Sequence, residues 1–309
     1  MTPTLDYNEM RDKLREYMKL SGKTQAVIAK ELDYSVAAVS QFLNDKYTGD
    51  NEEFAARVNQ LLNMGAVRKS LAKAPDFCME LSNTKSMLNQ ISIAHATNDI
   101  LLLYGPAGCG KSTACSYYAD HHKGTVLIEA DATTNSPRAV LSLIAEEVGE
   151  NSRGTTTIIM RTLVKYFKGS NKLLIIDEAQ HLTEKTFDTI RALNDKAGIG
   201  IVYSGNPSIL KNMFGCHQEQ FDQVFSRIGY HCKLDNEYSF DDIKQIFRNH
   251  NLDKDCLKYL LKTSHKKGGL RIMIKLYKLA ANIANALEVP VSVEILEDAK
   301  KRMGILEVS

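Results

Sequence analysis

The stretch Gly105-Pro-Ala-Gly-Cys-Gly-Lys-Ser-Thr113 decides the fold of this chain. It fits the pattern G-x-x-x-x-G-K-[ST], in which glycines let backbone N–H groups and a helix N-terminus surround nucleotide phosphates. Ile100-Leu-Leu-Leu-Tyr104, just before it, is an apolar run typical of a buried strand. A helix-compatible stretch begins at Lys111. Because a strand and a helix flank the loop, the sequence predicts a binding site for a nucleoside triphosphate.

Two polar residues of this loop have expected roles. The Lys111 ammonium would reach the β- and γ-phosphates, and the Ser112 hydroxyl would ligate Mg²⁺. Cys109 stands at a permissive position and is given no chemical role. The residues expected to contact the nucleotide are Gly105, Pro106, Ala107, Gly108, Cys109, Gly110, Lys111, Ser112 and Thr113.

Length and composition predict a soluble protein of two or three domains. The 309 residues are 44% hydrophobic and 25% charged, with a net charge of +2. No apolar run approaches the ~20 residues that span a bilayer, and the first residues do not resemble a secretory signal. Six scattered cysteines without a C-x-x-C pair favour free thiols in a reducing compartment. We therefore expect a cytoplasmic protein without a membrane partner.

The first 64 residues predict a compact all-helical domain. Thr24 and Ser35 stand where they would cap two short helices, at 26–32 and 36–43. Asp33 occupies the turn between them, and it enters left-handed conformations more readily than most residues. The pattern resembles the helix-turn-helix of phage-repressor-type domains.

The charge of this domain leaves its role open. Residues 1–64 hold eight Lys and Arg against ten Asp and Glu, a net charge of −2. The candidate recognition helix, residues 36–43, has no Lys or Arg, although phosphate neutralisation usually dominates DNA affinity. Weak or accessory DNA binding and docking to a protein are both compatible with this domain.

From residue 100, short apolar runs alternate with helical patterns, which predicts an α/β fold with a parallel sheet covered on both faces. Strands are expected at 100–104, 125–130, 173–177, 199–204 and 230–234. Helices are expected at 111–121, 138–148, 158–167 and 187–196, and an all-helical tail follows residue 239. The predicted domains are 1–64 helix-turn-helix, 65–85 linker, 86–235 α/β core and 236–309 helical C-terminal domain.

A second motif, Leu173-Leu-Ile-Ile-Asp-Glu178, is an apolar strand that ends in two carboxylates. A desolvated carboxylate is costly unless it meets a metal or another partner. Asp177 would hold Mg²⁺, directly or through water, and Glu178 would polarise the attacking water. The sequence thus predicts a hydrolytic nucleotide site.

Three further polar residues after Glu178 are candidates for the nucleotide site. Asn206 ends another apolar strand, where it would hold the attacking water or the γ-phosphate, or serve as a turn residue. Arg227 stands at the end of a helix before the last strand, and Arg271 at the start of a C-terminal helix. Either arginine alone would most often be a surface residue.

Taken together, these motifs and the helical lid behind them resemble AAA+ P-loop ATPases. The resemblance implies ATP and Mg²⁺ as cofactors, Asn206 as sensor 1 and Arg271 as sensor 2. It also implies that Arg227 is a finger that reaches the γ-phosphate held by a neighbouring subunit. ATP hydrolysis would then require a homo-oligomer, because the trans arginine stabilises transition-state charge.

Four short segments narrow the resemblance to one group within the AAA+ ATPases. They are Asn44-Asp-Lys-Tyr-Thr-Gly-Asp-Asn-Glu52, Ile175-Ile-Asp-Glu-Ala179, Phe225-Ser-Arg-Ile228 and Leu270-Arg-Ile272. In this domain order they resemble the transposition B proteins of Mu-like phages and prophages, over nearly the whole chain. This resemblance implies an ATPase in a bacterial host cytoplasm that polymerises on target DNA as a filament or ring. It also implies that the protein recruits and stimulates a transposase.

Two basic clusters are candidate DNA contacts. Arg153, Arg161 and Lys165 precede the Asp177 strand, in a region that AAA+ proteins often turn toward DNA. Residues 254–278 carry eight Lys and Arg against Asp255 alone. The first four of them, Lys254, Lys258, Lys262 and Lys266, recur every four residues, which predicts one stripe along a helix. We favour Arg153, Arg161 and Lys165 as the contacts to double-stranded DNA; ordinary solvation is the alternative for both clusters. Few aromatics lie among these cations, so phosphate binding without base readout is expected.

Two other functions share these motifs. The chain could be a transcription regulator whose helix-turn-helix reads an operator while ATP sets the oligomeric state. It could also be a loader for a replicative helicase, which uses the same ATPase core.

Overall fold

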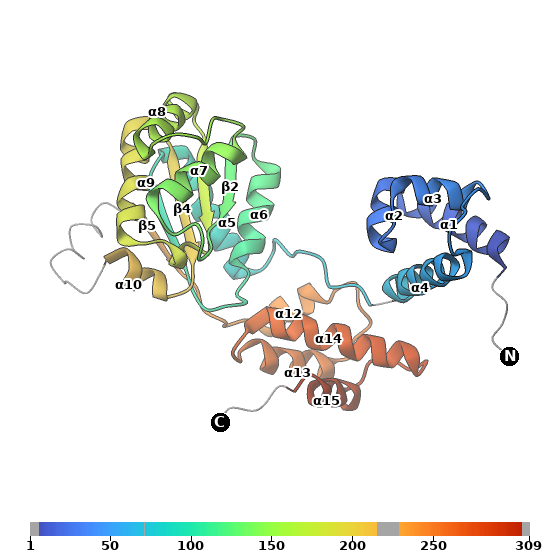
Figure 1. The fold of residues 1–309 in the computed structure, drawn as a ribbon. Coiled ribbons are helices and arrows are strands. Elements are labelled where there is room, and N and C mark those ends of the chain that lie inside the picture. Colours follow the sequence, from blue (N-terminus) through green and yellow to red (C-terminus); the bar gives the residue numbers. More distant parts are fainter. Residues whose placement is uncertain (1–5, 71, 215–228, 305–309) are drawn as a thin grey trace. The chain divides into compact units, whose positions relative to one another are not determined.

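The computed structural model describes residues 6–70, 72–214 and 229–304. The chain divides into two compact units, Met1–Lys73 and Ala74–Ser309, which Figure 1 shows in colours that follow the sequence. No helix among the described residues is long and apolar enough to cross a membrane. The two units are described separately below.

The first unit is all helical, as predicted. Its helices are α1 (Tyr7–Ser21), α2 (Gln25–Leu32), α3 (Val36–Leu43) and α4 (Asn51–Ser70). Asp33 adopts the expected left-handed conformation between α2 and α3, with φ of 59°, and the Ser35 hydroxyl accepts from the N–H of Ala38. The rings of Phe42 and Phe54 stack 4.1 Å apart in a fully buried core. The helix-turn-helix is therefore built around an aromatic centre.

Two local expectations for the first 85 residues were wrong. Thr24 lies at the N-cap of α2, but its side chain makes no capping hydrogen bond. Helix α4 continues to Ser70, inside the expected linker, and α5 (Ser82–Thr97) begins before its expected end. Gly65 is the one strong helix breaker between residues 60 and 70, and a single glycine costs too little to end a helix that is otherwise stable.

The second unit contains a five-stranded parallel sheet of order β2-β3-β4-β1-β5. The strands are β1 (Ile100–Tyr104), β2 (Thr125–Glu129), β3 (Leu173–Asp177), β4 (Gly200–Gly205) and β5 (Tyr230–Lys233). Each lies within one residue of its predicted bounds at both ends. The α/β prediction is confirmed.

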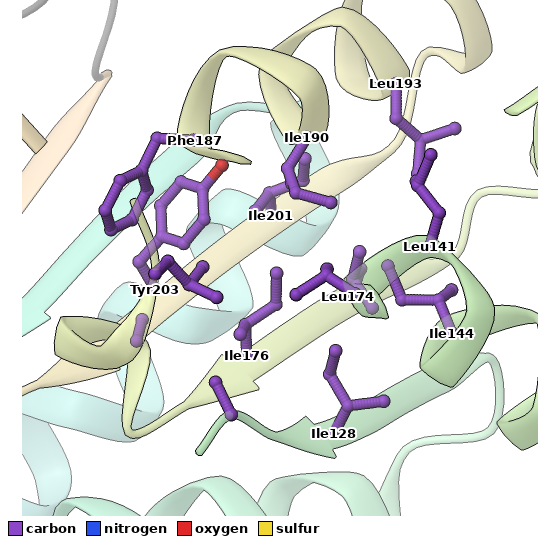
Figure 2. Packing of buried hydrophobic residues seen from close by; sticks show 14 of the residues in the cluster. Ile128, Leu141, Ile144, Leu174, Ile176, Phe187, Ile190, Leu193, Ile201 and Tyr203 are labelled. Atoms are coloured by element: carbon purple, nitrogen blue, oxygen red, sulfur yellow. The ribbon is translucent and has the colours of Figure 1, made fainter. Parts of the chain in front are cut away.

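Helices cover both faces of the sheet, because alternate strand residues point to opposite sides. Leu174 and Ile176 pack on one face with helices α7 to α10, as Figure 2 shows for part of this core. Leu173 and Ile175 pack on the other face, with α5 and α6. The covering helices are α5 (Ser82–Thr97), α6 (Lys111–His121), α7 (Pro137–Glu147), α8 (Thr156–Phe167), α9 (Glu184–Ala197) and α10 (Ser208–Phe214).

The C-terminal part is helical. It comprises α12 (Phe240–Ile246), α13 (Lys254–Ser264), α14 (Gly269–Ala286) and α15 (Val293–Arg302). Ser239 and Asp242 form a capping box at the start of α12, and the Ser292 hydroxyl caps α15. Helix α13 ends at Ser264, so Lys266 lies beyond the helix and the expected four-lysine stripe on one helix was wrong.

The sheet order brings the motifs together. Strands β3, β4 and β1 are neighbours, and their carboxyl ends lie at the same edge. The loop at 105–110 follows β1, Asp177 ends β3, and Asn206 follows β4. Residues separated by about a hundred positions in sequence thus meet at one end of the sheet.

Candidate nucleotide site

The loop after β1 has the geometry of a phosphate cradle. Gly108 and Gly110 have φ values of 86° and 95°, which favour glycine, and α6 begins directly afterwards at Lys111. The Lys111 ammonium donates to the carbonyl oxygens of Gly105 and Pro106, each at 2.9 Å. No carboxylate in the described part of the chain pairs with this lysine. Its charge is therefore available to a phosphate.

Asp177 is buried at the end of β3, with 7% of its surface exposed. One carboxylate oxygen accepts a 2.6 Å hydrogen bond from the Ser204 hydroxyl on β4. Burial, and next the charge of Asp177, raise the pKa of the Cys115 thiol on α6 to about 12. The Asp177 carboxylate therefore lies near enough to α6, the helix after the phosphate-binding loop, to affect the ionisation of Cys115.

The residues proposed for Mg²⁺ fit that ion. Ser112, exposed in the first turn of α6, and Asp177 supply the hard oxygen donors that Mg²⁺ prefers. Among the described residues, no group of three or more His, Cys, Asp or Glu side chains could enclose a metal. Mg²⁺ usually completes its coordination with phosphate oxygens and water, so two protein ligands suffice.

Asn206 lies at the same edge and forms a turn. Its side-chain oxygen accepts from the Ser208 N–H at 2.9 Å and the Ser208 hydroxyl at 2.6 Å, which starts α10. Among the described residues, the amide nitrogen of Asn206 has no acceptor, so it can donate to a ligand. The Asn206 side chain can therefore serve as a turn residue through its oxygen and contact the nucleotide through its nitrogen.

A pocket of about 590 Å³ joins these residues, within the range usual for small-ligand sites. It is lined by residues 107–113 of the loop, Glu178 and Asn206, together with Arg271 of α14. Of the residues predicted for the nucleotide site that the structure describes, Gly105, Pro106 and Asp177 are not part of the pocket lining. Arg227 lies outside the described residues.

One wall of the pocket was missed by the sequence analysis. Residues 74–78, 81, 83 and 84 line it, although this segment was expected to be part of a linker. Phe77 packs against Tyr117 of α6, with ring centroids 4.7 Å apart. Leu81 is buried, so the signal that could have found this wall is the pair of large apolar residues, Phe77 and Leu81, in a segment expected to be a linker.

Another part of the pocket lining comes from α14. The Leu270 N–H donates to the carbonyl oxygen of Gly108 at 3.1 Å. A Cβ atom at Gly108 would lie 2.0 Å from the carbonyl oxygen of Gly268. The helix start therefore touches the loop directly, and Arg271 is the residue that follows Leu270. Lys275 and Lys278 line the pocket as well, which the sequence analysis did not foresee.

The three predicted DNA contacts lie apart from this pocket. Arg161 and Lys165 are exposed one turn apart on α8, and Arg153 is exposed in the loop before that helix. None of the three is in the lining of the pocket or in an ion pair with a carboxylate of the described residues.

Comparisons with known proteins agree with this geometry. The AAA domain family matches residues 94–213, and the C-terminal domain family of the Mu B transposition protein matches residues 226–303. The chain is 28% identical over 275 residues to the Mu-like prophage FluMu DNA transposition protein B of Haemophilus influenzae, covering 86% of this chain and 94% of that protein. It is also 28% identical over 304 residues to the ATP-dependent target DNA activator B of Escherichia phage Mu, covering 97% of each.

Among solved structures, the Aeropyrum pernix ORC2 protein in its ADP form superposes with a TM-score of 0.53 at 19% identity, covering 78% of this chain and 74% of that one. This likeness concerns the fold. The fold and the nucleotide site together define an ATPase of the AAA class, which binds and hydrolyses ATP. Within that class, the chain is a homologue of the transposition B proteins of phage Mu and Mu-like prophages.

Proposed function

We propose that this chain is an ATP-dependent activator of target DNA in transposition. It would polymerise on double-stranded DNA of arbitrary sequence, recruit and stimulate a transposase, and hydrolyse ATP to disassemble. The observation that carries this proposal is the match to the phage Mu activator over 97% of both chains, which includes both units rather than the ATPase core alone. The setting would be the cytoplasm of a bacterial host.

The proposed chemistry follows from the pocket. Lys111 and Arg271, which both line the pocket, would hold the phosphates, and Ser112 and Asp177 would hold Mg²⁺. The ion neutralises charge on the β- and γ-phosphate oxygens when bound. Glu178 would orient and polarise the attacking water, and the amide of Asn206 would fix the water or the γ-phosphate. Support comes from the common sheet edge that places Asp177, Glu178 and Asn206 beside the loop.

Self-association is the second part of the proposal. Arg227 would act as a finger on the γ-phosphate held by the adjacent subunit, so that each site is completed only in an ATP-dependent homo-oligomer. Such a trans charge can increase the rate by several orders of magnitude. Filament growth on DNA would therefore control ATP turnover.

DNA contact is assigned to Arg153, Arg161 and Lys165. Their support is exposure and the lack of carboxylate partners in the described structure, which leaves their charges free for phosphates. Helix α3 offers small or neutral exposed side chains instead, such as Ala37 and Gln41. Contact through phosphates would give little sequence preference.

Electron microscopy with ATP and random-sequence duplex DNA tests the proposal. Expected are filaments or rings that form with ATP on any duplex, and ATP turnover that DNA stimulates. A strong preference for one palindromic site, kept without ATP, would instead support a transcription regulator. Co-purification with a replicative helicase and not with a transposase would support a helicase loader.

A further inference from the structure

Gln180 lies in the short turn after β3, two residues beyond Glu178, in a 3₁₀ turn at Ala179–His181. It is buried, with 8% of its surface exposed. The turn is on the same sheet edge as the nucleotide site. A buried polar side chain in such a place must satisfy its hydrogen bonds within the protein.

The side-chain amide of Gln180 joins two residues of the site. Its nitrogen donates to a carboxylate oxygen of Glu178, and its oxygen accepts from the N–H of Asn206 at 3.2 Å. A backbone N–H can only donate and an ionised carboxylate can only accept, so the two bonds fix the orientation of the amide. Gln180 therefore bridges the ends of β3 and β4.

The surroundings hold this bridge in place. The Asn212 side chain on α10 donates to the backbone oxygen of Gln180 at 2.5 Å. A Cβ atom at Gly205 would lie 2.6 Å from the side-chain oxygen of Gln180, so the last residue of β4 leaves the space that the amide fills. The bridge is thus fixed from the backbone and from the side chain.

Glu178 itself has an unusual backbone. Its φ of 51° lies in the left-handed region, which non-glycine residues seldom adopt. Such conformations persist where the surrounding structure determines them, and they are frequent at functional sites. The bond from Gln180 is a contact that orients the Glu178 side chain on this backbone.

We propose that Gln180 is a positioning residue for ATP hydrolysis. It holds the Glu178 carboxylate at one place and ties it to the β4–α10 turn that carries Asn206, so the two groups keep a fixed relation around the attacking water. The inference rests on the proposed role of Glu178. Its physical basis is that misplacing a reacting group by about 1 Å can cost on the order of 100-fold in rate.

Two substitutions of the full-length protein separate the two hydrogen bonds. Gln180→Glu keeps the size and an oxygen that accepts from Asn206, but it faces Glu178 with an acceptor instead of a donor. Gln180→Ala removes both bonds. For both variants we expect kcat for ATP to fall about tenfold or more. Affinity for a fluorescent ATP analogue should stay within about twofold, because Gln180 is outside the pocket lining.

His181→Ala is the matched control. His181 is the next residue of the same turn but is exposed, so its kcat should stay within about twofold of the wild-type value. Thermal unfolding of each variant reports whether the fold is retained. Should Gln180→Ala fail to fold, Gln180→Glu alone carries the test because it conserves volume.

A double-mutant cycle with Glu178→Gln distinguishes positioning from a general structural effect. If Gln180 acts through Glu178, adding Gln180→Glu to Glu178→Gln should lower kcat no further. Additive losses would overturn the inference, as would an unchanged or raised kcat in the Gln180 single variants. If Glu178→Gln turns over ATP at the wild-type rate, the proposed role of Glu178 fails, and the inference fails with it. If Glu178→Gln is slow while the Gln180 variants are normal, only the inference fails.

Discussion

The two units of this chain use their positive charges differently. In the helix-turn-helix unit, Arg11 pairs with Asp45 at 2.6 Å, and all of the other arginines with described side chains also contact carboxylates. In the ATPase unit, Lys111, Arg271 and the cations on α8 have no carboxylate partner among the described residues. The first unit thus pairs its described arginines with carboxylates, whereas the ATPase unit leaves these particular cations for a ligand, although it pairs others such as Lys85 and Arg191.

This difference in charge pairing shows that a helix-turn-helix fold does not by itself imply DNA binding. A helix-turn-helix places a helix where it could enter a DNA groove, but affinity needs cations that can replace the counterions of DNA. In the first unit, the net charge of −2 over residues 1–64 and the ion pairs of its arginines leave few cations for DNA phosphates. We therefore expect the ATPase unit to supply most of the affinity for both nucleotide and DNA.

The largest effect is expected at the nucleotide site. Lys111→Ala should reduce ATP turnover roughly 1,000-fold, because a preorganised charge on the phosphates is lost. Steady-state phosphate release measures it. Lys30→Ala, an exposed lysine of the first unit, is the control and should leave turnover within about twofold. A loss below about tenfold for Lys111→Ala would contradict its assigned role.

The second prediction tests whether the units are independent. Phe54→Ala should destabilise the first unit by about 3 kcal/mol, because it leaves a cavity between stacked rings. Hydrogen exchange in α4 measures this loss, and ATP turnover should change less than about twofold. Met64→Ala, at a position that is 52% exposed, should cost within about 0.5 kcal/mol. A parallel loss of ATPase activity would show that the units depend on each other.

The third prediction concerns DNA. Arg161→Glu with Lys165→Glu should weaken binding to random duplexes about tenfold at ~0.15 M salt and reduce the salt dependence by roughly two phosphate contacts. The weakening should be the same for every sequence. Lys13→Glu with Lys30→Glu is the matched charge reversal on the first unit and should have a smaller effect. If the α8 variant binds DNA with unchanged affinity, the assignment to α8 is wrong, and the cations of residues 254–278 become the candidate DNA contacts.

The smallest effect is expected from an ion pair of the first unit. Asp45→Ala should lower its stability by about 0.5–1 kcal/mol, because Asp45 is 78% exposed and solvent screens the pair. Arg11 retains its 2.8 Å bond to the Phe42 carbonyl oxygen. Asp12→Ala, which removes the more exposed pair with Arg15, should cost less. Urea unfolding of the two variants compares them, and a larger loss for Asp12→Ala would contradict this order.

Features that depend on local sequence were predicted well. Strand bounds follow from runs such as Leu173–Asp177, and helix starts follow from caps such as Ser35, because periodicity and capping act over a few residues. The position of Asp177 at the sheet edge followed from the strand it ends. The AAA-type core, which was inferred from the resemblance of its motifs to a known family, is confirmed by the family match and the parallel sheet.

Features that depend on tertiary contacts were not predicted. The segment around Phe77 forms a pocket wall only because it packs on α6, forty residues later in the chain. Gln180 was given no role because its partner Asn206 lies in the turn after another strand, β4. Lys266 was assigned to a helix that ends two residues earlier, at Ser264. A single sequence shows these residues, but it does not show which residues they contact in the folded protein.

The close approach of Gly108 and Gly268 has an evolutionary consequence. A side chain at Gly108 would collide with the backbone of the lid, and its φ of 86° already disfavours any other residue. The phosphate-binding loop and the lid therefore cannot diverge separately at this point. A lineage that replaced Gly108 would have to displace the start of α14 in the same step, so this contact restricts which variants of the protein selection can reach.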